Sequence, residues 1–230
     1  MTTLSLLEKL QFLWDDFLSF VNTGIRENKY PKEILDNFTL IDKSQINKIN
    51  DNAKYNVSCG SCESNCCSRI DGKILLTLKD IAVLIDNGHE NSIEGSFRGF
   101  ATLLKDYQEN RDNSVFNDVS RLMQDMLNNE YMPYLKKIGS ACVFMSESGL
   151  CKVYDIRPVS CKMYPYHYDA SGKEIVWLNN CQSKSKNMSE EDKDRVVSNI
   201  AEFENERIKD ISLVMLNIEN LGKIGYKDYL

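Results

Sequence analysis

The sequence lacks any long apolar run. No stretch approaches the roughly 20 apolar residues that cross a bilayer, and charged side chains interrupt the most apolar early segment, residues 4–21. The first four residues, Met1 to Leu4, also lack the basic side chain that begins a secretory signal. We therefore expect a cytoplasmic protein that is neither exported nor bound to a membrane.

An excess of positive charge is absent as well. Lysine and arginine number 28 against 34 aspartates and glutamates, and the net charge at pH 7 is −6. Broad non-specific binding to nucleic acid needs a positive field, so we expect none here. A length of 230 residues with 42% hydrophobic content suits one globular core. The sequence thus predicts a single domain over residues 1–230.

Signatures of several enzyme classes are missing too. Only two histidines occur, which gives little support to a histidine-rich iron site. No G-x-G-x-x-G loop appears, which weakens the case for a nucleotide-cofactor enzyme without excluding it. No Ser-His-Asp or Cys-His pairing stands out. The sequence therefore leaves catalytic activity open and identifies no substrate.

Eight cysteines, in contrast, are abundant for a cytoplasmic chain. An adjacent pair closes a C-x2-C-x3-C-C arrangement, and a disulfide between neighbours is strained. Without an export signal the thiols should stay reduced, and clustered reduced thiols are metal ligands or redox groups. We predict that all eight are metal ligands, in two groups: Cys59, Cys62, Cys66 and Cys67, then Cys142, Cys151, Cys161 and Cys181.

Four thiolates suit tetrahedral zinc or a 4Fe-4S iron–sulfur cluster, and eight could form two such sites. We expect the two groups to converge on a shared metal centre; isolated zinc ribbons and buried core thiols are the alternatives. Zinc closed by four protein ligands does no chemistry, which favours the cluster over zinc. We also expect metal removal to destabilise the domain, since residues 55–70 offer few apolar side chains.

Hydrophobic periodicity predicts an α+β domain, mostly helical, with a small hairpin-based sheet around a cysteine-rich metal site. Capping boxes begin helices at Thr77, which would end near Gly88, and at Ser189, with a break near Asn217. Further helices are expected over residues 4–21 with a stop at Gly24, and over 44–54, 92–108 and 115–137. Strands are expected over 74–76 and 174–178, a loop over 55–70, and a hairpin over 141–154 across which Cys142 and Cys151 could face each other.

Two runs of residues carry a resemblance to a known family. Residues 59–67 and the run from Gly149 through Cys151, Arg157, Pro158 and Cys161 to Pro165 resemble the CxxCxxCC cysteine-cluster family, also called YkgJ-like or zinc- or iron-chelating proteins. Three residues separate Cys62 from Cys66, where the family name implies two. The resemblance covers roughly residues 57–181, a cysteine-cluster core with helical extensions on either side.

The resemblance implies a bound zinc or iron centre and no agreed reaction, so a metal ion is the expected partner. Flagellin lysine methylases share a related cysteine cluster, which makes an iron–sulfur enzyme of methyl transfer the second hypothesis. A zinc-stabilised protein-interaction module is the third.

Overall fold

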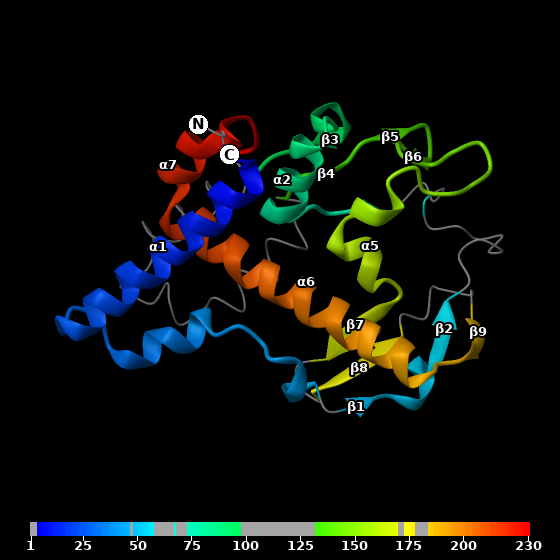
Figure 1. Ribbon diagram of the computed structural model, residues 1–230, viewed down its shortest axis with the longest axis horizontal. Coiled ribbons are helices and arrows are strands. Elements are labelled where there is room, and N and C mark those ends of the chain that lie inside the picture. Colours follow the sequence, from blue (N-terminus) through cyan, green and yellow to red (C-terminus); the bar gives the residue numbers. More distant parts are fainter. Residues whose placement is uncertain are drawn as a thin grey trace, which may run out of the picture. The chain divides into compact units, whose positions relative to one another are not determined.

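The computed structural model describes residues 4–46, 48–57, 67, 73–97, 132–169, 173–177 and 184–230 (Figure 1). The chain divides into two compact units. The first consists of Met1–Leu40, Leu75–Tyr134 and Glu206–Leu230, and the second of Ile41–Ile74 and Leu135–Asn205. The single domain that we expect over residues 1–230 stays a prediction.

The first unit begins with helix α1, Leu6–Arg26. A capping box starts it: the Ser5 hydroxyl accepts from the Glu8 amide at 3.2 Å, and the Glu8 carboxylate accepts from the Ser5 amide at 2.8 Å. The helix expected over residues 4–21 is therefore confirmed, although it continues past Gly24. The side chains that it buries share one face: Leu6, Leu10, Leu13, Trp14, Phe17 and Val21.

Helix α2, Leu78–Asp86, packs against α1. The predicted capping box is confirmed, because the Asp80 amide donates to the Thr77 hydroxyl at 3.1 Å and the Thr77 amide donates to the Asp80 carboxylate at 3.0 Å. The helix ends as predicted near Gly88, whose φ of +74° lies in the left-handed region that glycine adopts without strain. Short 3₁₀ helices, η1 (Lys32–Phe38) and η6 (Glu90–Ser92), also belong to this unit.

The C-terminal helix α6 spans Glu190–Leu216, and its residues from Glu206 onward belong to the first unit. Ser189 and Asp192 form the predicted capping box, with the Asp192 amide 3.1 Å from the Ser189 hydroxyl. The predicted break is confirmed at Asn217, the N-cap of helix α7, Ile218–Leu221, which contacts α1. A π-helix, η9 (Gly222–Tyr226), and a 3₁₀ turn, η10 (Lys227–Tyr229), complete the chain.

The second unit contains a three-stranded sheet in the order β1-β8-β7. Strand β8, Glu174–Trp177, lies parallel to β1, Lys48–Ile49, and antiparallel to β7, Tyr166–Asp169. The strand expected from Glu174 is thus confirmed. The core of this unit consists of buried side chains from the sheet, from α6 and from the segments next to them: Ile46, Ala53, Tyr166, Ile175, Trp177, Met188, Val196, Ile200 and Ala201.

The remaining ladders are short. Antiparallel β2 (Tyr55–Val57) and β9 (Lys184–Asn187) form one pair, and β5 (Lys137–Ile138) with β6 (Ala141–Cys142) form another. A further pair joins β3 (Ile93–Glu94) to β4 (Tyr134–Leu135). Helices with sheets of two or three strands make the fold α+β and mostly helical, as predicted. In the described ranges, no helix has both the length and the apolar character to cross a membrane.

Four predicted elements differ from the structure. The helix expected over residues 44–54 is replaced by 3₁₀ turns, η2 (Lys43–Gln45) and η3 (Asp51–Ala53), on either side of β1. The cause is local: Asp42 accepts from the Ser44 amide at 2.8 Å and Asn50 from the Asn52 amide at 3.2 Å, which closes turns instead of a helix.

The loop expected over residues 55–70 begins instead as strand β2. The prediction of helices over 92–108 and 115–137 is wrong where the structure has strands. These are residues 93–94 of the first range and residues 134–135 and 137–138 at the end of the second. Residues 98–131 of those two helices lie outside the described ranges. The strand expected over 74–76 is present as a bridge between Leu75 and Tyr134.

One carboxyl group in the first unit is buried in an acidic environment. Asp210 is 1% exposed, and its Oδ1 accepts from the Leu78 amide at the start of α2 at 3.1 Å. Burial raises the pKa of Asp210 well above its ordinary value, and the nearby charges of Glu206 and Asp80 raise it further. Folding therefore favours the protonated form of this side chain.

A substitution at the centre of the second unit tests its core. Ile175 is fully buried, whereas Val176, the next residue of β8, points to the other face and is half-buried. We expect Ile175→Ala to lower the free energy of unfolding by about 2–5 kcal/mol, since it leaves a cavity. Val176→Ala, the matched control, should cost clearly less in the same urea titration. Equal losses would contradict the burial assignment.

The raised pKa of Asp210 predicts a specific pH dependence. Because the folded-state pKa lies above the unfolded value of about 3.9, the folded chain holds an extra proton between the two values. Its stabilising effect is complete below the unfolded pKa and is lost as pH rises through the folded pKa. The unfolding free energy of the wild type should therefore fall relative to Asp210→Asn as pH rises from about 4. Glu219→Gln, a change at an exposed carboxylate, is the control; parallel curves for wild type and Asp210→Asn would refute the prediction.

Candidate metal centre

The described cysteines of the second group lie on short elements of the second unit. Cys142 ends strand β6 and pairs with Lys137 of β5 across a turn at Gly139, whose φ is +63°. It is 6% exposed. Its carbonyl accepts from the Met145 amide at 2.9 Å, which turns the chain directly after the cysteine.

Cys151 occupies the next turn. It forms an antiparallel bridge with Met145, and the Ser146 amide donates to the Leu150 carbonyl at 2.8 Å within the connection. Gly149, with φ of +77°, allows that connection to close. The predicted hairpin therefore exists in shortened form, but Cys142 and Cys151 do not pair across it. That expectation is wrong because the residue opposite Cys151 in the hairpin is Met145, and Cys142 pairs with Lys137 of β5 instead.

Cys161 lies in helix α5, Val159–Met163, an element that the periodicity did not predict. Pro158 is its N-cap and accepts from the Cys161 amide at 2.9 Å. Val159 is fully buried and anchors the helix, while Cys161 is half-buried. Proline is over-represented at the first helical position, and Pro158 stands one residue before it, so this proline was the nearest sequence signal for the short helix.

Arg157 stands immediately before this helix. Its guanidinium carbon lies 3.8 Å from the ring centroid of Tyr154, which is a cation–π contact. Tyr154 is the first residue of the 3₁₀ turn η8, Tyr154–Ile156. The Nε of Arg157 is buried and has no hydrogen-bond partner among the described residues. Arginine therefore keeps an unused buried donor and a full positive charge in the segment between Cys151 and Cys161, which suits an anionic neighbour.

The structure leaves the full ligand set open. Cys67, Cys142, Cys151 and Cys161 are thiols and not disulfides, and all four lie in the second unit. Within the described ranges, no three Cys, His, Asp or Glu side chains gather closely enough to hold a metal ion. The other four cysteines fall outside those ranges: Cys59, Cys62, Cys66 and Cys181. Convergence of the two cysteine groups therefore stays a prediction.

The donor set nevertheless has the chemistry of a metal-chelating domain. Soft thiols with close spacing suit zinc and iron, and harder oxygen-seeking metals do not prefer them. A family model described as "Putative zinc- or iron-chelating domain", named CxxCxxCC, matches residues 58–189. Since this match spans more than half of the sequence, the chain belongs to the CxxCxxCC family. The family description supports metal binding in general.

The other comparisons add no relative. Neither a curated protein nor a solved structure matches the chain. The family assignment therefore comes from the cysteine-bearing sequence itself, and it agrees with the resemblance seen in residues 59–67 and 149–165.

The contact between Arg157 and Tyr154 can be measured by a double-mutant cycle. Cation–π pairs at exposed sites contribute about 0.5–1 kcal/mol, and Tyr154 is 63% exposed. We expect Arg157→Gln and Tyr154→Leu to show a coupling energy of about 0.5–1 kcal/mol in urea unfolding. Fully additive losses would show that the two side chains do not interact in solution.

Proposed function

We propose that this chain is a metal chelator whose centre is formed by cysteine thiolates and holds zinc or iron. One observation carries the proposal: all eight cysteines fall within residues 58–189, the range of the family match, and the flanking helical segments contain none. Thiols that served only as small core side chains would have no reason to be confined in this way.

The placement of the described thiols supports this function. Cys142, Cys151 and Cys161 sit on a two-residue strand, a single bridge and a five-residue helix. Such short pieces bury little apolar surface and are marginal by themselves. Metal–thiolate bonds would hold these segments together and supply folding free energy directly.

Charge supports the same conclusion. A metal ion surrounded by four thiolates carries net negative charge, which a nearby cation stabilises. Arg157 provides a permanent positive charge with a buried, unused Nε donor in the segment between two of the proposed ligands. We therefore assign Arg157 as an electrostatic support for the centre.

The thiol set fits two kinds of metal group. Zinc closed by four cysteines would be structural, whereas an iron–sulfur cluster would supply redox or Lewis-acid chemistry when bound. The ligands that we propose are Cys59, Cys62, Cys66, Cys67, Cys142, Cys151, Cys161 and Cys181.

Metal analysis of protein purified without oxygen tests the proposal. With four thiolates per site, we expect about one or two zinc equivalents, or iron with acid-labile sulfide. Brown colour with sulfide identifies a cluster, and a colourless protein with zinc identifies a closed zinc site. Both outcomes support chelation, and a chain that carries neither metal would contradict it.

Single substitutions test the ligands. Cys151→Ser and Cys161→Ser should each weaken metal retention against a competing chelator by about tenfold or more, because serine is a poor ligand for soft metals. Ser148→Ala, an exposed change beside Cys151, should retain the wild-type metal content. Equal metal retention in all three variants would remove Cys151 and Cys161 from the ligand set.

Removing the metal should lower the melting temperature. A structural centre stabilises the fold by its binding free energy, so a shift of several degrees or more is expected after verified chelation. An unchanged melting temperature in metal-free protein would show that the centre does not stabilise the fold.

A further inference from the structure

A cavity of about 300 Å³ lies within the first unit, whose residue ranges contain no cysteine. Helix α1, the start of α2 and the last turns of α6 provide its walls. The apolar part of the lining consists of Leu7, Leu10, Trp14, Leu78 and Leu213. A concave, largely apolar cavity with a few polar groups is the usual form of a small-molecule site.

Asp210 lines this cavity and has an unsatisfied oxygen. Its Oδ1 accepts from the Leu78 amide at 3.1 Å, but its buried Oδ2 has no hydrogen-bond partner. Two neighbouring donors are committed elsewhere: Lys209 Nζ lies 3.0 Å from Glu206 Oε1, and the Tyr226 hydroxyl donates to the Leu78 carbonyl at 2.8 Å. A buried acceptor without a donor is costly, so this oxygen calls for a donor that the described protein residues do not provide.

The charges around the cavity favour a cationic donor. The lining contains three acidic side chains and two basic ones, so it has one excess negative charge when Asp210 is ionised; they are Glu8, Glu206 and Asp210, and Lys79 and Lys209. Burial, together with the charges of Glu206 and Asp80, raises the pKa of Asp210. The ionised form of Asp210 is therefore disfavoured as long as no positive group lies beside it. A positive hydrogen-bond donor at Oδ2 would stabilise that carboxylate, and an anion would not.

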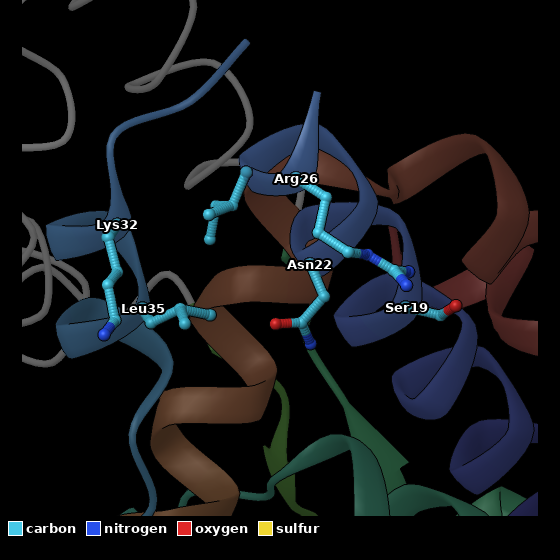
Figure 2. A pocket seen from close by; sticks show the side chains of 6 residues that line it. Ser19, Asn22, Arg26, Lys32 and Leu35 are labelled. Carbon is cyan, nitrogen blue, oxygen red and sulfur yellow. The ribbon is translucent and has the colours of Figure 1, made fainter. Parts of the chain in front are cut away.

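A second hollow, of about 540 Å³, lies beside α1 and η1 but carries no comparable signal. Its polar lining side chains are exposed: Ser19, Asn22, Arg26 and Lys32. Figure 2 shows that Arg26 and Lys32 lie on different sides of this hollow and do not converge on one point. The cavity at Asp210 is therefore the better candidate for a ligand.

We propose that the cavity at Asp210 binds a small organic cation, a primary ammonium on a short apolar chain. The ammonium donates to Asp210 Oδ2, and the chain lies against Leu10, Trp14 and Leu213. The lining of this cavity belongs to the first unit and includes no cysteine, so the proposal does not rest on the proposed metal centre.

Matched probes of different charge test the proposal on the full-length chain as purified. The probes are n-hexylammonium, n-hexanol and hexanoate, which share one apolar chain. The sequence has two tryptophans, so the indole N–H signals in a ¹H–¹⁵N spectrum report separately on Trp14 in the cavity and Trp177 in the second unit. Trp177→Phe assigns the two signals.

We expect n-hexylammonium to shift the Trp14 signal in a saturable way, with little effect from the other two probes at equal concentration and none at Trp177. Asp210→Asn should weaken the affinity for n-hexylammonium by about tenfold or more, since it removes a buried charge-assisted hydrogen bond. Glu219→Gln makes the same charge change at an exposed site and should leave the affinity unchanged.

Three results would overturn the proposal. These are an absence of any shift at Trp14, equal effects of n-hexylammonium and n-hexanol, and wild-type affinity for n-hexylammonium in Asp210→Asn. If Asp210→Asn does not fold, the comparison of the three probes on the wild-type chain decides the question alone.

Discussion

The bond between a cysteine thiolate and a metal ion is the interaction on which our account of the second unit depends. The described thiols of the second group, Cys142, Cys151 and Cys161, are positioned by very little backbone structure: two residue pairs in β5–β6, one bridge at Cys151 and the five residues of α5. Backbone ladders of this size do not hold a fold together. Stability must come from side-chain packing, as at Val159, and in our proposal from metal–thiolate bonds as well.

The two units differ in their chemistry. The second has a core beneath the β1-β8-β7 sheet and holds the described thiols. The described part of the first consists mainly of packed helices; the residue ranges of this unit contain no cysteine, and Asp210 in it is a buried carboxyl group. Soft ligands and buried carboxylates select different partners, a transition metal in one case and a cationic donor in the other. No described residue favours methyl transfer or a protein-interaction role over chelation.

Local signals in the sequence were sufficient to predict the helices α1, α2 and α6. The capping boxes at Thr77 and Ser189, the break at Asn217 and the apolar face of α1 depend on neighbouring residues, and each was predicted. Elements that depend on pairing with distant residues were not predicted. Strand β1 forms because Lys48 and Ile49 pair with Glu174 and Ile175 far along the chain, and no local pattern near residue 48 encodes that pairing.

The candidate site shows the same limit. The family could be recognised from residues 149–165, because the identities and spacing of the cysteines are written directly in the sequence. The register that pairs Cys142 with Lys137 could not be predicted, because a ladder of two residue pairs is too short to show a periodic sequence pattern.

X-ray absorption at the metal edge of the native protein tests the central claim most directly, since it measures the ligand atoms themselves. Our account predicts sulfur neighbours at about 2.3 Å from zinc or iron. A first shell made only of nitrogen and oxygen at about 2.0–2.2 Å would contradict a thiolate centre.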